Sequence, residues 1–322
     1  MHCPRIGHYA RLNSNGTIGC CGHMVNAQQF ATFSAMENSA WQEQLRMQML
    51  NNQWPDECLR CKQTEEHNGT SIRLGSIERD KILSKFNKDY IQLGGTLDNY
   101  CNSACVTCNP NLSTRIGSLK KSIVIRDNYE LYKTLPLDRV TEIDINGGEP
   151  SVSVNYNHLL NNLPDSVRIV RINTNGCVKI KQVEQLLAQG IAVIITVSFD
   201  GIGTVHDYIR YPVKWTKFKQ NLEYYRELST QNAKLKLDTW TTVSALNINY
   251  ISDIQKYCKD RNIRHSYAFL NTPEVLNVKY KNWFTSDIQI DGVATERDNT
   301  VELNAFLELE EACRPGIERF WI

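Results

Sequence analysis

Three cysteines in one short run carry the clearest chemistry in this sequence: Cys101, Cys105 and Cys108 form a C-x3-C-x2-C pattern. A structural zinc ion or an electron-transfer cluster is normally held by four protein ligands, so this run lacks one ligand for a closed site. A 4Fe–4S cluster that is held by three thiolates keeps one iron open for another molecule. The spacing therefore indicates an open cluster, or a metal site that is completed from elsewhere in the chain.

A second motif, Gly147-Gly148-Glu149-Pro150, follows further along the chain. In this order the two motifs resemble the radical S-adenosylmethionine (radical SAM) superfamily. The resemblance implies that the three cysteines hold a 4Fe–4S cluster, that SAM chelates the open iron, and that the Gly-Gly-Glu-Pro backbone holds the SAM amino group. The chain departs from the family at Thr107, where an aromatic or bulky apolar residue usually packs on adenine. Adenine stacking must then come from another residue.

The same resemblance implies a reaction. One electron from the reduced cluster, supplied by a flavodoxin- or ferredoxin-like donor, cleaves SAM to methionine and a 5′-deoxyadenosyl radical. That radical abstracts hydrogen from an unactivated carbon of a substrate. Because a misplaced substrate would let the radical react elsewhere, the site must be dry and rigid.

Before the C-x3-C-x2-C run lies a second group of cysteines: Cys3, Cys20, Cys21, Cys58 and Cys61. Asn13-Ser14-Asn15-Gly16 is a turn signal between two strand-like runs, residues 9–12 and 17–18. The resulting hairpin would bring the first three of these thiols near one another. A helix predicted over residues 39–50 then leads to the C-x2-C pair.

This order of hairpin and C-x2-C is similar to the SPASM and twitch auxiliary-cluster modules of peptide-modifying radical SAM enzymes, here in the amino-terminal position of twitch-type proteins. It implies an auxiliary 4Fe–4S cluster on four thiolates: Cys3, Cys21, Cys58 and Cys61. Cys20 is the alternative to Cys21. The residues alone leave open a structural zinc ion or an unmetallated site. His67 is expected to be a solvated loop residue.

Alternating strands and helices begin at about residue 90. We predict strands over residues 90–97, 140–146, 167–173, 191–198, 234–243 and 264–270. Helices are predicted over residues 112–121, 155–163, 180–189, 214–228 and 248–261. This alternation predicts an α/β fold with a parallel sheet, and the resemblance implies a partial (β/α)6 open barrel with a small amino-terminal cysteine-rich module. The expected domains are an auxiliary module and its polar connection (1–88), the barrel (89–271) and a covering segment with a helix near 301–313 (272–322).

One face of the predicted sheet is polar. In residues 142–146 the acidic and amide side chains alternate with isoleucines. In residues 168–173 and 235–244, polar side chains likewise share one face. Burying such a face in a closed core would cost about 1–3 kcal/mol for each unpaired polar group. An open barrel with a wet lumen avoids that cost, and solvated edge strands are the alternative. Glu142, Asp144 and Lys236 are candidates for proton transfer, or for a salt-bridge network with Arg171.

Active sites of such barrels lie at the carboxyl ends of the strands. By the resemblance, the positions that contact SAM there are Asn173, Ser198, Asp200 and Ser244, beside the Gly-Gly-Glu-Pro motif. The last strand offers Tyr267, with Phe269, as a wall for adenine in place of Thr107.

Composition narrows the class of protein. The 322 residues include 36 basic and 35 acidic side chains, for a net charge of +1, which gives no general reason to expect nucleic acid or a membrane as partner. The longest apolar run, residues 191–197, is too short to span a bilayer. The first residues lack the apolar stretch of a signal peptide, so no leader is expected, and the two groups that hold eight of the eleven cysteines favour metal binding in a reducing compartment. A cytoplasmic protein is therefore expected.

The leading hypothesis is a radical SAM enzyme that acts on a peptide or protein. Its substrate class rests on the similarity of the auxiliary module alone. The alternatives are a radical SAM enzyme for a nucleotide or small metabolite, and a zinc-stabilised binding protein without catalysis.

Overall fold

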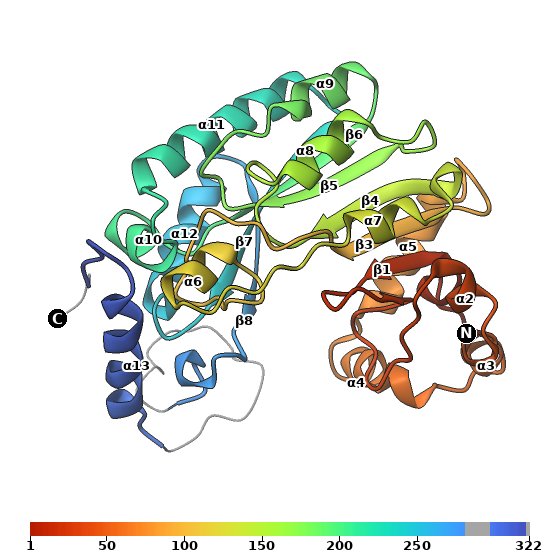
Figure 1. Cartoon of the computed structure of the whole chain (residues 1–322), viewed down its shortest axis with the longest axis horizontal. Helices are drawn as coiled ribbons and strands as arrows, with labels where there is room; N and C mark the ends of the chain where they lie inside the picture. The colour runs from red at the N-terminus through yellow and green to blue at the C-terminus, as the bar shows by residue number, and fades with distance from the viewer. Residues whose placement is uncertain (281–296, 320–322) are drawn as a thin grey trace.

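The computed structural model describes residues 1–280 and 297–319. Its centre is an eight-stranded sheet in the order β2-β1-β3-β4-β5-β6-β7-β8 (Figure 1). The strands from β3 onward run parallel and in chain order: β3 (Ile91–Thr96), β4 (Val140–Asn146), β5 (Ile169–Thr174), β6 (Ala192–Ser198), β7 (Leu235–Val243) and β8 (Arg264–Phe269). These strands confirm the six predicted ones and the expected α/β open-barrel fold.

Helices connect the parallel strands, as predicted: α6 (Thr114–Leu119), α8 (Val154–Asn161), α9 (Gln182–Ala188), α11 (Trp215–Gln231) and α12 (Ile251–Lys259). Two short helices, α7 (Tyr129–Lys133) and α10 (Thr204–Ile209), were not predicted. The segment around α10 is rich in turn residues, with Gly201 and Gly203 before it and Pro212 after it, and these signals mask a six-residue helix. None of the described helices is long and apolar enough to cross a bilayer.

The amino-terminal segment joins the same sheet. The predicted hairpin is present as β1 (Tyr9–Leu12) and β2 (Ile18–Gly19), preceded by α1 (Arg5–His8) and followed by α2 (Phe33–Glu37) and α3 (Ala40–Leu50). Strand β1 pairs in parallel with β3, and Leu12 shares a hydrophobic core with Leu93. Residues 1–88 therefore extend the barrel sheet and share its core.

The polar connection predicted over residues 62–88 carries secondary structure that was not predicted. It contains two helices, α4 (Leu59–Asn68) and α5 (Ile72–Leu83), separated by Gly69 in a left-handed conformation (φ +65°). The buried residues of α5 include Arg73 and Ser76, because this helix lies beside the polar face of the sheet. Its buried stripe is therefore partly polar, and the hydrophobic period that signals a helix is weak.

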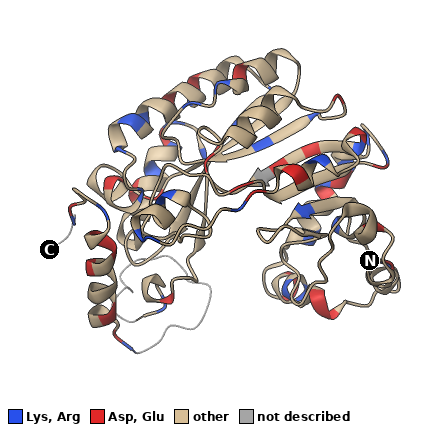
Figure 2. Cartoon of the chain, viewed as in Figure 1, with Lys and Arg blue, Asp and Glu red and all other residues tan. Residues whose placement is uncertain are grey.

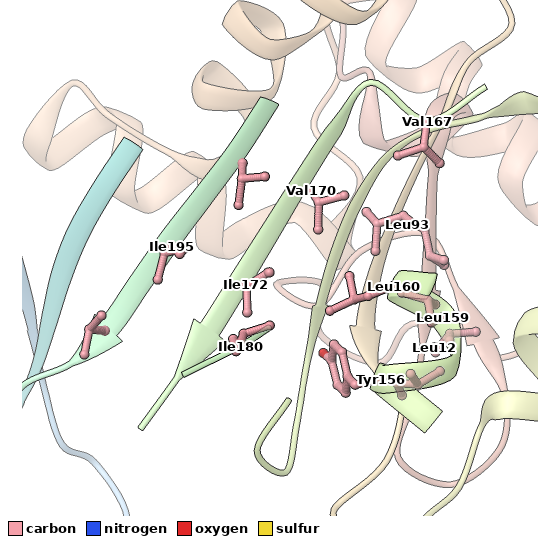
Figure 3. Packing of buried hydrophobic residues seen from close by; sticks show 14 of the residues in the cluster. Leu12, Leu93, Tyr156, Leu159, Leu160, Val167, Val170, Ile172, Ile180 and Ile195 are labelled. Atoms are coloured by element: carbon pink, nitrogen blue, oxygen red, sulfur yellow. The ribbon is translucent and has the colours of Figure 1, made fainter. Parts of the chain in front are cut away.

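The register of the strands separates an apolar from a polar face. Leu93, Ile143, Val170 and Ile195 follow one face, where they are buried under the helices (Figure 3). The opposite face carries Gln92, Glu142, Asp144, Arg171, Asn173, Lys236, Asp238 and Trp240. Acidic residues lie on β4 and a basic residue lies on its neighbour β5, and a further basic residue lies on β1, which β3 separates from β4 (Figure 2). The predicted two-faced sheet is thus confirmed.

The carboxyl-terminal helix α13 (Thr300–Ala312) confirms the predicted helix at 301–313 and lies at the opposite end of the molecule from the amino-terminal segment (Figure 1). Its Leu303 and Leu307 share a small core with Val106 of the cysteine run and Tyr208 of α10. The segment expected to cover the barrel thus packs beside the cysteine run. The part of that segment at residues 281–296 lies outside the described residues.

Candidate active site

The C-x3-C-x2-C run forms a loop after the carboxyl end of β3 and is held by its backbone. The amide of Ala104 donates to the carbonyl of Tyr211 (2.7 Å), and the amide of Val106 donates to the carbonyl of Ile209 (2.9 Å). These two bonds pair the loop with the segment that follows β6 and α10. The middle of the run is therefore fixed from outside: Cys105 lies between the two fixed residues, and Cys101 and Cys108 flank them.

Arg314 is the second anchor of this loop, and no motif in the sequence pointed to it. Its side chain is 2% exposed, and its guanidinium donates to the carbonyl oxygens of Ala104 (2.8 Å) and Cys105 (3.4 Å). Glu310, one turn earlier, pairs with the same guanidinium. Because a buried cation needs such partners, the end of α13 and the cysteine loop are coupled.

The three thiols lie close enough to affect one another. Burial, and then the neighbouring Cys105, raise the pKa of Cys101 to about 12 and the pKa of Cys108 to about 11. Burial also raises the pKa of Cys105. Thiolates in such a setting need a compensating positive charge, which a metal cluster supplies. Thiols are the donors that an iron–sulfur cluster needs, but the described side chains of this buried and two half-buried cysteines are not arranged as a ready metal site.

The glycines of the second motif allow its loop to approach the cysteine run. Gly147 and Gly148 have φ of +108° and +51°, a region that favours glycine. A β-carbon on Gly148 would lie 2.4 Å from the carbonyl oxygen of Tyr100, and one on Gly147 would lie 2.6 Å from that of Asp98. The residues just before Cys101 thus pack directly on the backbone after β4.

Glu149 joins the ends of β4 and β5. Its side chain is buried, and its carboxylate accepts hydrogen bonds from the Ser151 amide and hydroxyl (3.0 and 2.7 Å), the Thr174 hydroxyl (2.7 Å) and the Asn175 amide (2.6 Å). Burial raises the pKa of Glu149, whereas these donors oppose the rise. The carboxylate therefore connects the loop after β4 to the end of β5.

The network continues into the cysteine run through Asn175. Its side-chain amide donates to the Asn102 side-chain oxygen (2.8 Å) and to the Ser103 hydroxyl (2.7 Å). From the other side, the Glu149 amide donates to the carbonyl of Tyr100 (2.7 Å). The two motifs that the sequence singled out are therefore connected directly and through the end of β5.

The other residues predicted to contact SAM differ in their surroundings. Asn173 is exposed and Ser198 half-buried, both on the polar face of the sheet. Asp200 is buried: its carboxylate accepts from the Thr242 amide (2.8 Å) and pairs with Arg210 (3.1 Å). Ser244 is fully buried, and its hydroxyl accepts from an amide within its own turn, that of Leu246 (3.3 Å).

Arg210 is a residue of this region that sequence analysis missed. Its guanidinium is 12% exposed, and the charges of Cys105 and Asp200 raise its pKa despite its burial. A cation in this place lowers the pKa of the Cys105 thiol against the effect of burial. The only sequence signal is its position soon after Asp200, in the segment of α10.

The predicted adenine wall at Tyr267 stays a prediction. In the β7–β8 ladder Tyr267 is level with Thr241 and Phe269 with Val243, and both partners are buried on the apolar face. The face that a residue of an edge strand shares depends on the register of that strand, which a short half-polar run does not fix. Trp240, one residue from Thr241 and 41% exposed, is an aromatic residue on the polar face, level with Ser198.

Four of the five amino-terminal cysteines line one narrow cavity with only about 10 Å³ of free space. Its walls include all four thiols that the resemblance pairs: Cys3, Cys21, Cys58 and Cys61. Cys20 is buried beneath it, 3.6 Å from the sulfur of Met24. Burial raises the pKa of Cys3 to about 11 and raises that of Cys61. His67, expected in a loop, is exposed in α4.

Arg5 separates this cavity from the barrel. It lines the cysteine cavity and also a second cavity over the polar face, which includes Asp144. Its guanidinium lies over the ring of Tyr9 at 4.0 Å. Across residues 1–280 and 297–319, no three His, Cys, Asp or Glu side chains come together closely enough to hold a metal ion.

The close approach at Gly148 predicts a stability effect. Alanine there would combine an unfavourable φ with a contact to the Tyr100 carbonyl, so Gly148→Ala should lower the free energy of unfolding by about 2–4 kcal/mol. Gly75 lies inside α5 with open space around it, so Gly75→Ala should raise stability by about 0.5–1 kcal/mol. Urea denaturation measures both; equal effects would contradict the close approach.

Comparisons with known proteins give distant matches only. No family model matches the chain, and no curated protein matches it. Among solved structures it is similar to SuiB of Streptococcus suis bound to S-adenosylmethionine (14% identity, TM-score 0.44, covering 93% of this chain and 67% of that one). SuiB bound to the precursor peptide SuiA gives 13% identity, a TM-score of 0.43, and 94% and 68% coverage.

A third similar structure is anSMEcpe with bound AdoMet, with 16% identity, a TM-score of 0.41, and coverage of 56% of this chain and 52% of that one. The chain thus spans about half the length of anSMEcpe and about two thirds of SuiB. Overlaps of this size leave the chemistry to be inferred from the chain's own residues.

Proposed function

We propose that this chain is a radical SAM enzyme that abstracts hydrogen from a peptide or protein substrate. The observation that carries the proposal is the network in which Glu149 and Asn175 connect the Gly-Gly-Glu-Pro loop, the end of β5 and the cysteine run. Cys101, Cys105 and Cys108 would hold a 4Fe–4S cluster there. When bound, such a cluster supplies the electron that cleaves SAM to a 5′-deoxyadenosyl radical.

The surrounding residues would position SAM. The backbone of Gly147 and Gly148 approaches without side chains, and the carboxylate of Glu149 holds its neighbouring loops rather than the ligand. Asn173 and Ser198 lie on the polar face near the strand ends, where they can reach the ribose or carboxylate of SAM. Asp200 and Ser244 would act as positioning residues, since their side chains bond within the protein.

Trp240 is our candidate for adenine stacking. It is 41% exposed on the polar face and level with Ser198, whereas Thr107 has no ring and Tyr267 follows the opposite face. A tryptophan ring offers a large, sequence-independent stacking surface for a base, typically worth about 1–3 kcal/mol.

The amino-terminal cavity would hold an auxiliary 4Fe–4S cluster on Cys3, Cys21, Cys58 and Cys61. With four protein thiolates that cluster would transfer electrons or stabilise the fold. All eleven cysteines are free thiols, which suits a reducing compartment such as the cytoplasm. The reaction requires an external one-electron donor of the flavodoxin or ferredoxin type.

The first prediction concerns Cys105. After anaerobic reconstitution the wild-type protein should contain about eight irons, and Cys105→Ala should retain about four because the second cluster is intact. With dithionite and SAM, the wild type should form 5′-deoxyadenosine and Cys105→Ala none. Cys313→Ala, at the end of α13, is the matched control and should behave as wild type. Cleavage by Cys105→Ala, or zinc in place of iron, would refute the proposal.

The second prediction distinguishes Cys21 from Cys20. Because Cys21 lines the cavity and Cys20 packs beneath it, Cys21→Ala should lose about four irons, and Cys20→Ala should keep its iron after reconstitution. Iron and sulfide analysis measures this. Loss of iron from the Cys20 variant with retention in the Cys21 variant would reverse the assignment.

The third prediction concerns adenine. Trp240→Ala should weaken SAM binding by roughly tenfold, about 1.4 kcal/mol, through loss of base stacking. Tyr267→Ala is the control, because its ring follows the other face of the sheet. Equilibrium dialysis of SAM with the reconstituted protein measures both. A weaker affinity in the Tyr267 variant alone would restore the original sequence-based assignment.

A further inference from the structure

One cavity lies over the polar face of the sheet, and a second lies at the amino ends of its later strands, where Ser229 of α11 and Asn262 also line it. One includes Arg5, Gln92 and Asp144 in its lining, and the other includes Lys236 and Arg264. Arg79 of α5 and Arg171 of β5 line both cavities, so the two are parts of one groove. The cavity volume is about 370 Å³ in the first and about 460 Å³ in the second. We call this the basic groove.

The groove has more positive than negative side chains. Five cations line it: Arg5, Arg79, Arg171, Lys236 and Arg264. Three carboxylates face or adjoin them: Glu142, Asp144 and Asp238. With every group ionised, the excess is two positive charges. This local excess contrasts with the near-neutral chain as a whole.

The pairing within the groove leaves part of this charge uncompensated. Arg79 and Arg171 both contact the same oxygen of Glu142, Oε1, at 2.9 and 2.8 Å. The second oxygen, Oε2, is buried and without a hydrogen-bond partner among the described residues. One carboxylate therefore neutralises the charge of two guanidinium groups only in part. Burial raises the pKa of Glu142 to about 7, so near neutral pH this carboxyl carries less than a full negative charge.

The other end of the groove has a free cation. Asp238 is engaged by Arg264, whose Nε donates to it at 2.7 Å. Lys236 lies two residues before Asp238 on the same strand face; it is exposed, and no ion pair involves it within the described part of the chain. The exposed Lys236 and the arginine pair Arg79 and Arg171, whose charge Glu142 only partly neutralises, therefore line the same cavity.

The shape and lining of the groove favour an extended anionic ligand. Its cations come from α1, α5, β5, β7 and β8, so they are spread across the sheet. Among the described residues that line it, none is aromatic, so it offers no stacking surface for a nucleotide base. Carboxylates spaced along an extended chain match this distribution of cations.

We propose that the basic groove binds an acidic segment, rich in Asp and Glu, of the peptide substrate. This inference rests on the proposed function and specifies its substrate class. Lys236 and Trp240 are four residues apart on β7, which is about 13 Å at about 3.3 Å per residue. The acidic segment therefore lies about four extended residues from the substrate residue that is placed beside the strand ends.

The test uses the full chain, anaerobically reconstituted, with fluorescein-labelled hexaglutamate and hexaglutamine as probes. Fluorescence anisotropy should show binding of hexaglutamate but not of hexaglutamine. The affinity should fall at least fivefold between 50 and 300 mM salt, because the contacts are between exposed charges. Binding of both probes with equal affinity, or of neither, would overturn the proposal. Displacement of hexaglutamate by AMP but not by free glutamate oligomers would likewise overturn it, since the groove would then select phosphate.

Lys236→Gln locates the binding. Its side chain is exposed and unpaired, so the variant should fold normally and bind hexaglutamate about fivefold more weakly. Lys256→Gln is the matched control, because Lys256 is an exposed lysine on the outer helix α12, paired with Asp260; its affinity should equal that of the wild type. Equal weakening in both variants would place the peptide elsewhere and contradict the proposal.

Measuring SAM cleavage on the same samples separates the two claims. Cleavage without hexaglutamate binding would leave the enzyme proposal standing and refute the acidic substrate. Binding without cleavage would support the groove as a site for acidic peptides and refute the radical chemistry.

Discussion

The carboxylate of Glu149 is buried, and both of its oxygens accept hydrogen bonds. The donors lie after β4 and at the end of β5. A buried carboxylate costs several kcal/mol unless its oxygens are bonded. Here the cost is offset only when both loops are in place. The same loops hold the cysteine run through Asn175 and the Tyr100 carbonyl. One interaction therefore orders the parts of the candidate site that the sequence separates.

A second constraint is the polar face of the sheet. Parallel sheets are usually covered on both faces by apolar contacts, but here Glu142 and Arg171 lie on a face that also carries Arg79 from α5. Charges in such a place need partners or solvent, so the barrel stays open on this side. The amino-terminal segment uses that side: β1 extends the sheet, and Arg5 lies between the auxiliary thiols and the groove. Substrate binding and auxiliary electron transfer would thus meet on one surface.

The six strands and their polar face were predictable, because apolar and polar residues alternate with a period of two, as Ile143 and Asp144 do. The cysteine run and its glycine partner were also recognisable by spacing. The contacts of Arg314 and Arg210 were not predictable from the sequence. No local motif marks a buried arginine, and its partners come close to it only in the folded chain. The face that Tyr267 shares was not predictable for a related reason: the face of an edge-strand residue is set by register against the neighbouring strand, not by composition.

The account depends on SAM binding directly to an iron that the three thiols of the cysteine run leave open. Electron–nuclear double resonance of the reduced, reconstituted protein with SAM labelled by 15N at its amino group measures this contact. We predict a 15N hyperfine coupling to the cluster that is absent without SAM and absent in a variant without Cys105. A reduced cluster that shows no such coupling at saturating SAM would contradict the central claim.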